Sequence, residues 1–439
     1  MKKPILNLIL LILLSAALLL PGASLRAQSA SGCTDVVVQS GDSLSGIAAR
    51  YLGSFGAYAQ IVSATNAAAA KDSSYTRINN ANSISSGWKL CIPTGSAATN
   101  APATNNARQP AVVPTPTATP DAEPLTLQEE YAERWDGKGP FPLTFEYLRQ
   151  QKYPGSEITI EQTLAPGVNY QRYYVSYRSE GLKIYALLTV PNGPKPATGW
   201  PAIIFNHGYI PPEIYRTTER YIAYVDGFAR SGYIVFRPDY RGHAFSEGEA
   251  NGAYGNPDYV IDVLNALASV KNYADTDPDR IGMWGHSLGG YITLRSMIVN
   301  GDIKAGVIWA GVVGSYDDMI NRWRRPQGSV PPAIPQRARR WRQLLIDEFG
   351  TPAENPAFWN SISANSQLDE ISAPIQLHHG TADADVPIEF SEQLEKQLLE
   401  AGKSVELYTY AGDDHNLSGY FNTVMQRSVA FFDEHVKNQ

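Results

Sequence analysis

The stretch DRIGMWGHSLGGYITL, residues 279–294, places one serine, Ser287, between Gly285 and Gly289. The apolar run before Ser287 is typical of a buried strand, and LGGYITLRSMI (288–298) has the apolar spacing of a helix. Ser287 is therefore expected on a tight strand-to-helix turn, with the helix N-terminus directed at its hydroxyl. The alternative is an ordinary polar residue in a glycine-rich turn, and partners elsewhere in the chain have to decide between the two.

Residues 125–439 alternate strand-like runs with helical patterns, which predicts one α/β domain with a mostly parallel sheet and flanking helices. The runs are near-continuous and apolar, as expected of parallel strands buried on both faces. They are PAIIFNHG (201–208), GYIVFRPD (232–239), RIGMWGHS (280–287), AGVIWAGV (305–312), APIQLHHG (373–380) and SVELYTYAG (404–412). Two helices are predicted at 213–232 and 258–273, and an antiparallel edge hairpin at 173–191.

A serine hydroxyl needs a base, and the α/β-hydrolase fold supplies its partners in the chain order Ser, acid, His, each after a strand. Asp383 follows the HGTA turn after the strand 373–380, and His415 lies in GDDHNLSG after the strand 404–412. In this arrangement His415 takes the proton of Ser287, and Asp383 holds the imidazole in the required tautomer. Asp385 is the main rival to Asp383.

Other polar residues near these strand ends have alternative interpretations. His286 adjoins the serine but is expected to point away from its hydroxyl, and one of His378 and His379 is expected to be a structural histidine. The cluster HHGTADAD also resembles a metal site, but it has no spaced second cluster, so neither a metal nor a cofactor is predicted.

The oxyanion of an acyl-transfer intermediate needs two backbone donors. The N–H after the nucleophile, that of Leu288, is one expected donor, and the loop after the strand 201–208 offers Tyr209 as the second. The alternative for NHGY is a tight turn with no catalytic role.

An insert at about 316–370 is expected to form a helical cap over the site. It is rich in arginine and tryptophan: Arg322, Arg324, Arg325, Arg337, Arg339, Arg340, Arg342, Trp323 and Trp341. Either the cap receives an anionic or aromatic substrate group, or these residues form a solvated helix face.

The large domain resembles the catalytic domain of the prolyl oligopeptidase (S9) family over roughly residues 165–439. The resemblance rests on SEGLKIYALLTVP, FNHGY, RPDYRGHAFSEG, DPDRIGMWGHSLGGY, HHGTADADVP and GDDHNL. It implies a serine peptidase with Ser287, Asp383 and His415 as the triad. The sequence shows no counterpart of the family's N-terminal β-propeller, and it reads GHSLGG where GxSYGG is common. A carboxylesterase acting on acyl or feruloyl groups of wall or polysaccharide esters is therefore the alternative, and an inactive wall-binding protein is disfavoured by the triad order.

Residues 33–93 predict a small α+β unit with the order strand, helix, helix, strand. Cys33 and Cys91 lie in the first and last strands and are expected to form a disulfide, which a unit this small needs. The alternative, a lipid-modified Cys33, is disfavoured because the apolar leader ends well before it.

This unit resembles a LysM domain in VVVQSGDSLSGIAARY (36–51), Ile61, the Asn66 region and SGWKLCIP (86–93). The resemblance implies binding of peptidoglycan or chitin-type glycan. Its expected site residues are Gly41, Asp42, Ser43, Asn80 and Ile84. An adaptor without a glycan ligand is the alternative.

The N-terminal segment, the linker and the net charge indicate where the protein is located. Residues 1–27 combine Lys2 and Lys3 with a long apolar run and predict a signal peptide, with an uncleaved anchor as the alternative. Residues 94–124 are rich in Ala, Thr and Pro and predict an extended linker. The net charge of −7 gives no nucleic-acid footprint. The whole pattern predicts a secreted or cell-envelope protein that has a peptide or ester substrate and, once the leader is removed, no stable membrane span.

Overall fold

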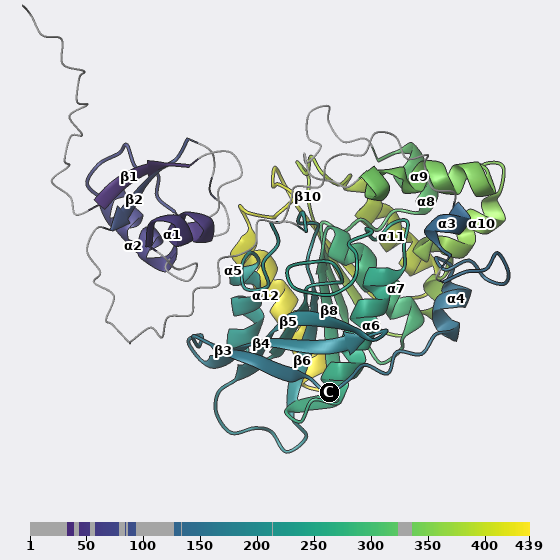
Figure 1. Cartoon of the computed structure of the whole chain (residues 1–439), viewed down its shortest axis with the longest axis horizontal. Coiled ribbons are helices and arrows are strands. Elements are labelled where there is room, and N and C mark those ends of the chain that lie inside the picture. Colours follow the sequence, from purple (N-terminus) through teal and green to yellow (C-terminus); the bar gives the residue numbers. More distant parts are fainter. Residues whose placement is uncertain are drawn as a thin grey trace, which may run out of the picture. The chain divides into compact units, whose positions relative to one another are not determined.

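The computed structural model describes residues 33–38, 44–52, 58–78, 84, 87–93, 127–132, 134–212, 214–323 and 336–439. These residues fall into two compact units, one containing the described residues up to Pro93 and the other those from Leu127 onward (Figure 1). The predicted leader, the predicted linker and four of the predicted glycan residues, Gly41, Asp42, Ser43 and Asn80, lie outside the described residues.

The first unit has the predicted order of elements: β1 (Cys33–Val37), α1 (Leu44–Leu52), α2 (Tyr58–Ala69) and β2 (Lys89–Pro93). The two strands are antiparallel, and Asp35 pairs with Cys91. The predicted disulfide joins Cys33 and Cys91 across the strands, with 5.2 Å between their Cα atoms. Its core is small, as its size requires, and consists largely of Val36, Leu44, Ile47, Ile61 and Leu90.

The second unit is built on a nine-stranded sheet with the order β11-β10-β9-β8-β6-β7-β5-β4-β3. The six strands from β11 to β7 are parallel, and β5, β4 and β3 continue the sheet in antiparallel pairs. The strands are β3 (Thr159–Leu164), β4 (Tyr170–Ser179), β5 (Leu182–Pro191), β6 (Trp200–Asn206), β7 (Ile234–Pro238), β8 (Thr276–His286), β9 (Gly306–Trp309), β10 (Ile375–Gly380) and β11 (Val405–Tyr410). The predicted α/β fold class and edge hairpin are confirmed.

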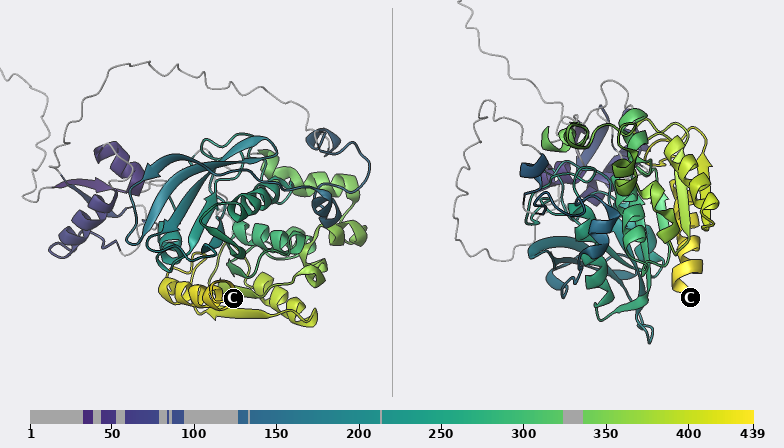
Figure 2. Two further views of the ribbon diagram at one scale, coloured as in Figure 1. Left: turned by 90° about the horizontal axis from the view of Figure 1, so that it is seen from below. Right: turned by 90° about the vertical axis from the view of Figure 1, so that its right-hand side faces the viewer.

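Helices cover both faces of this sheet (Figures 1 and 2). Successive strand residues point to opposite faces, so Ile203 and Phe205 join one apolar cluster and Ile204 the other. The first cluster includes α5 (Ile222–Arg230) and α12 (Phe421–Phe432), which is continued by a π-helical turn at Asp433–Lys437.

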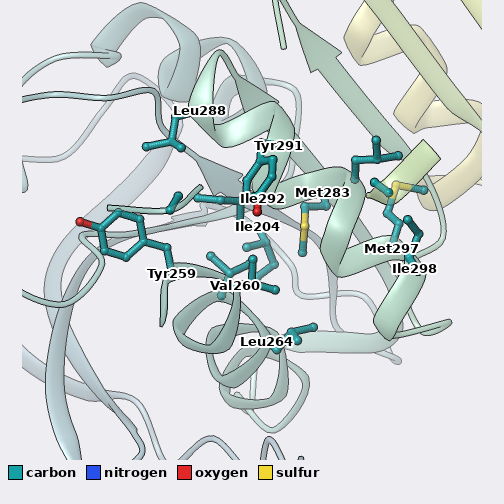
Figure 3. Packing of buried hydrophobic residues seen from close by; sticks show 14 of the residues in the cluster. Ile204, Tyr259, Val260, Leu264, Met283, Leu288, Tyr291, Ile292, Met297 and Ile298 are labelled. Atoms are coloured by element: carbon teal, nitrogen blue, oxygen red, sulfur yellow. The ribbon is translucent and has the colours of Figure 1, made fainter. Parts of the chain in front are cut away.

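The other face packs on α6 (Asp258–Lys271), α7 (Leu288–Val299) and α11 (Glu389–Glu400). Figure 3 shows its centre, where Ile204 and Met283 from the sheet meet Val260, Leu264 and Ile292 from the helices. Helix α7 is buried almost throughout, so its packing fixes the position of its first residue, Leu288.

The helix predicted at 213–232 is shorter in the structure. It begins at Ile222, because Arg220 and Tyr221 have left-handed backbone angles, with φ of 54° and 50°. The described residues before them form turns in place of helix. Sequence periodicity in this segment does not reveal the two left-handed residues.

The insert at 316–370 is helical, with α8 (Tyr316–Asn321), α9 (Gln336–Phe349), α10 (Pro356–Ile362) and two short 3₁₀ turns, Ala364–Ser366 and Leu368–Glu370. Two further short helices, α3 (Leu127–Glu130) and α4 (Phe145–Gln150), precede the sheet. The insert contacts the loop after β10, because the Trp323 indole donates to the Asp385 carbonyl at 2.8 Å.

The cap tryptophans belong to the interior of the domain. Trp323 and Trp341 are buried, and the Arg342 guanidinium lies over both rings, 5.6 and 5.1 Å from their centres. Arg322 is exposed and pairs with Asp318, and Arg340 is exposed. The side chains of Arg324, Arg325, Arg337 and Arg339 lie outside the described part of the chain. The solvated-face interpretation therefore fits Arg322 and Arg340, and it is wrong for the two tryptophans.

Candidate active site

Ser287 lies on the predicted turn between β8 and α7. Its backbone has φ 56° and ψ −117°, a conformation that a residue with a side chain adopts at a cost of roughly 1–3 kcal/mol. Hydrogen bonds from the neighbouring strand end hold it there. The Ser287 N–H donates to the Trp309 carbonyl at 3.0 Å, and its carbonyl accepts from Val312 and Gly290, also at 3.0 Å.

Close backbone approach explains the glycines around Ser287. A Cβ at Gly285 would clash with the Gly289 carbonyl, and a Cβ at Gly289 would clash with the Asn206 carbonyl at the end of β6. A Cβ at Gly290 would lie 2.7 Å from the Gly311 Cα. The turn therefore requires glycine at all three positions, and the strand-to-helix interpretation of this motif is confirmed.

Asp383 and His415 meet at the same edge of the sheet. The His415 Nδ1 lies 2.7 Å from the Asp383 Oδ2, and the Asp383 side chain is only 1% exposed. The other carboxylate oxygen accepts from the backbone N–H groups of Asp385 and Val386, at 2.8 and 2.9 Å. Asp385 thus supports Asp383 through its main chain, which favours Asp383 over its rival as the acid.

The Asp383 carboxylate is held in its ionised form. Burial alone would raise its pKa, but hydrogen bonds from His379 and His415 and the charge of His415 outweigh burial and hold the pKa well below its ordinary value. An acceptor that stays ionised keeps the proton of His415 on Nδ1, and Nε2 is then the nitrogen with a free lone pair.

His379 is a partner of Asp383 that sequence reasoning did not assign. Its Nε2 lies 3.1 Å from Asp383 Oδ2 and 3.1 Å from the Val386 carbonyl, while its Nδ1 lies 2.8 Å from the Ser391 hydroxyl. Both acceptors near Nε2 require a proton there, so His379 donates to the acid. Its position directly before Gly380, on β10, was the available signal.

The structural histidine predicted in this pair is His378. It is fully buried and bonds Tyr410 and Gln376, at 2.9 and 2.7 Å, and burial lowers its pKa to about 3. His378 is thus neutral and satisfied by its neighbours.

Asp383, Asp385 and His415 each place one ligand atom within 4.8 Å of the others, an arrangement that is compatible with a metal ion. The donor chemistry argues against one. Both oxygens of Asp383 already accept hydrogen bonds, and an ion there would have to break the bond to His415. The residues therefore fit an acid–imidazole pair better than a metal site.

His286, the last residue of β8 and the chain neighbour of Ser287, connects the Ser287 turn to the loop of His415. The His286 Nε2 lies 2.9 Å from the His415 carbonyl, and the two rings are 4.7 Å apart. His286 contacts the backbone of the His415 loop, and its ring bonds Tyr221 on the other side. The prediction that it points away from the serine hydroxyl agrees with these contacts.

Of the two predicted oxyanion donors, Leu288 follows the serine in the chain and Tyr209 follows a glycine that lies close to the serine. Leu288 is the first residue of α7, so no carbonyl within that helix accepts its N–H. Tyr209 follows Gly208, where an added Cβ would lie 3.2 Å from the Ser287 Cβ. The Gly208 N–H donates to the Tyr221 hydroxyl at 2.9 Å. The assignment of Tyr209 and Leu288 stays a prediction.

Comparison with known proteins identifies the class of this molecule. The α/β-hydrolase family model matches residues 199–421, and the LysM domain model matches residues 36–93. The chain belongs to the α/β-hydrolase family and carries a LysM domain at its N-terminus, so the predicted hydrolase fold and the LysM resemblance are confirmed.

The curated relatives are described as peptidases. The chain is 29% identical over 252 residues to the uncharacterized peptidase YtmA of Bacillus subtilis, a match that covers 57% of this chain and 88% of that protein. It is 29% identical over 250 residues to the uncharacterized peptidase YuxL of the same organism, a match that covers 56% of this chain but only 35% of that protein.

Among solved structures, an acetyl xylan esterase from Paenibacillus sp. R4 superposes with a TM-score of 0.50 at 16% identity. The match covers 65% of this chain and 91% of the esterase. At this identity the likeness concerns the fold alone.

Among the described residues, none of the helices is both long and apolar enough to cross a bilayer.

Of the predicted glycan residues, the structure describes Ile84, which is half-buried. Near it, the Asn66 side chain bonds both backbone groups of Ile78, at 2.7 and 2.9 Å, and so fixes the segment that follows α2.

Proposed function

We propose that this chain is a secreted serine hydrolase of peptidase type, which the LysM domain holds on a cell-wall glycan. Ser287 is the nucleophile, His415 the base and Asp383 the acid. The observation that carries the proposal is the 2.7 Å bond between Asp383 and His415 beside the strained turn at Ser287. Such a turn and such a pair serve a nucleophile that is activated by an oriented imidazole.

The reaction follows from these positions. The Nε2 of His415 takes the Ser287 proton while Oγ attacks the carbonyl carbon, and the carbonyl oxygen becomes an oxyanion that accepts from the N–H groups of Leu288 and Tyr209. The intermediate expels the amine or alcohol, which takes the proton from His415. Water then attacks the acyl-enzyme by the same route and releases the acid and free Ser287.

Asp383 acts on His415 alone. By accepting the Nδ1 proton it fixes the tautomer, and its charge stabilises the imidazolium that forms in each step. Its two backbone donors and His379 keep the carboxylate in place.

Amide cleavage is favoured over ester cleavage by the relatives. The first relative reported, a protein described as a peptidase, is matched over 88% of its length. The triad can catalyse both amide and ester cleavage, so measured turnover of the two substrate types must distinguish a peptidase from an esterase. We expect acyl-peptide p-nitroanilides to be cleaved, and p-nitrophenyl esters with matched acyl groups to be cleaved faster because their leaving group is better.

The matched control is Ser287→Ala, which should remove both activities. Ester turnover with no anilide cleavage across a broad peptide set would make the protein a carboxylesterase. Retention of either activity in Ser287→Ala would reject the assignment of the nucleophile.

The LysM domain is proposed to bind peptidoglycan or chitin-type glycan. The two compact units permit a direct test with residues 28–98 and with the full chain. We expect both to sediment with insoluble peptidoglycan or chitin. If neither polymer retains the full chain, the tether is wrong, while the hydrolase assignment is unaffected.

A further inference from the structure

A series of partly buried hydrogen bonds, beside the Ser287 turn in the chain, runs from the loop after β6 to the loop after β11. The Tyr221 hydroxyl lies 2.9 Å from the Gly208 nitrogen and 2.7 Å from the His286 Nδ1. The His286 Nε2 lies 2.9 Å from the His415 carbonyl. Two side chains thus connect the predicted oxyanion loop with the loop of the base.

The direction of each bond follows from the groups at the two ends. The His415 carbonyl only accepts, so the His286 Nε2 carries a proton and donates it. The Gly208 N–H only donates, so it points at the Tyr221 oxygen.

The middle bond follows from the charge state of His286. Burial, together with the nearby His415, lowers the pKa of His286 to about 3, so the ring is neutral and its Nδ1 is an acceptor. Burial raises the pKa of Tyr221 to about 12, so the phenol keeps its proton and donates it to Nδ1. Each group in the series has one possible role.

The backbone is strained to place the Tyr221 side chain here. Arg220 and Tyr221 are consecutive left-handed residues without glycine, at a cost of roughly 1–3 kcal/mol each. The buried Arg237 of β7 compensates by donating to the carbonyls of Arg220, at 2.7 Å, and Thr217. Strain that surrounding bonds maintain is characteristic of functional positions.

We infer that Tyr221 and His286 are positioning residues that hold the Gly208–Tyr209 peptide and the His415 loop in register with Ser287. This inference rests on the proposed hydrolase function. It assigns a role to His286, which occupies the variable position of the G-x-S-x-G motif. Misplacement of a reacting group by about 1 Å costs on the order of 10²-fold in rate, so the series has a measurable effect on turnover.

The test removes single groups and follows ester hydrolysis by the full chain. Tyr221→Phe deletes the central hydroxyl and is expected to lower kcat by about 10- to 100-fold with little change in KM. Tyr233→Phe is the matched control, because its hydroxyl also makes one short bond, 2.7 Å to Asp433, away from the site. Equal kcat values for the two variants would overturn the inference.

A double-mutant cycle separates positioning from general packing. If the two side chains act as one unit, Tyr221→Phe combined with His286→Phe should lower kcat no further than His286→Phe alone. Independent, multiplying effects would contradict a connected series.

A second readout does not depend on activity. In protein labelled with ¹⁵N-histidine, His286 should show a neutral ring protonated at Nε2 between about pH 5 and 8, and Tyr221→Phe should shift its Nδ1 resonance. A ring protonated at Nδ1 would contradict the proposed series of hydrogen bonds. If the protein shows these signals but cleaves no ester, the proposed function is rejected while the series of hydrogen bonds is confirmed.

Discussion

The turn at Ser287 and the loop at Gly208 lie side by side but are held by different means. The Ser287 turn is fixed by backbone: its glycines approach the main chain at the end of β6 and just after β9, and main-chain bonds with Trp309 and Val312 hold the serine. The Gly208 loop is fixed by side chains: the Tyr221 hydroxyl, the His286 ring and the Ser287 Cβ surround its one glycine.

This difference shows which local conformations a short sequence motif can reveal and which depend on packing between distant segments. A backbone that approaches another backbone tolerates glycine only, so the Ser287 turn appears in the sequence as G-x-S-x-G-G. A loop held by a tyrosine thirteen positions away leaves no such signature. Substitution at the first region should therefore affect folding, and substitution at the second should affect mainly turnover.

The largest effect is expected at the pair of Asp383 and His415, because this bond orients the base. Asp383→Asn keeps the shape of the acid but offers an amide to the imidazole, which then adopts the wrong tautomer. Turnover should fall by about 10⁴-fold, the loss found when the acid of a serine protease triad is made an amide. Measured kcat for matched esters checks this, with Asp385→Asn as the control that should retain most of the activity. The reverse ranking would make Asp385 the acid.

Gly289→Ala tests the region held by backbone. The new Cβ would meet the Asn206 carbonyl, which cannot move without displacing β6, so stability should fall by about 3 kcal/mol or more. Gly301→Ala is the control, since its Cβ would meet only the Ser372 hydroxyl at 3.6 Å. Chemical denaturation of both variants measures the difference. A folded, stable Gly289→Ala protein would contradict the close approach.

Gly208→Ala tests the region held by side chains. Its Cβ would lie 2.6 Å from the Tyr221 hydroxyl, 3.1 Å from the His286 Nδ1 and 3.2 Å from the Ser287 Cβ. Side chains move more easily than backbone, so the protein should fold while kcat falls by about 10- to 100-fold. If Gly208→Ala instead unfolds as readily as Gly289→Ala, the distinction between the two regions fails.

The smallest effect concerns stability in acid. The pKa of Asp383 is lower in the folded protein than in the unfolded chain, where it is about 3.9. Its ionised form therefore adds stability that is fully present above pH 4 to 5 and is lost as the pH falls through the folded pKa. The stability advantage of the wild type over Asp383→Asn should be smaller at pH 3 than at pH 5. An advantage that grows between pH 5 and pH 3 would show that the pKa of Asp383 is raised.

Much of the fold was predictable because its signals are local. The apolar runs predicted all six parallel strands to within a few residues, and turn glycines predicted the position of Ser287. The edge strand β3 was not predicted, since its residues are largely exposed and TIEQTL lacks an apolar run. The start of α5 was missed because two left-handed residues break the helix.

The site was predictable as far as chain order determines it. The order of Ser287, Asp383 and His415 predicted that the last two would meet, and the structure joins them directly. The roles of Tyr221 and His286 depend on contacts between segments that are distant in sequence. Local patterns carry no information about such contacts, so these two residues required the structure, whereas His379 contacts Asp383 only four positions away.

Ser287 as an activated nucleophile is the central assignment, and covalent labelling tests it most directly. The full chain is treated with a fluorophosphonate, which reacts with serines activated by a neighbouring base, and the modified residue is identified by peptide mass spectrometry. We expect a single adduct on Ser287, which is lost in Ser287→Ala and nearly lost in His415→Ala. Labelling that persists in Ser287→Ala, or an adduct on another residue, would contradict this assignment.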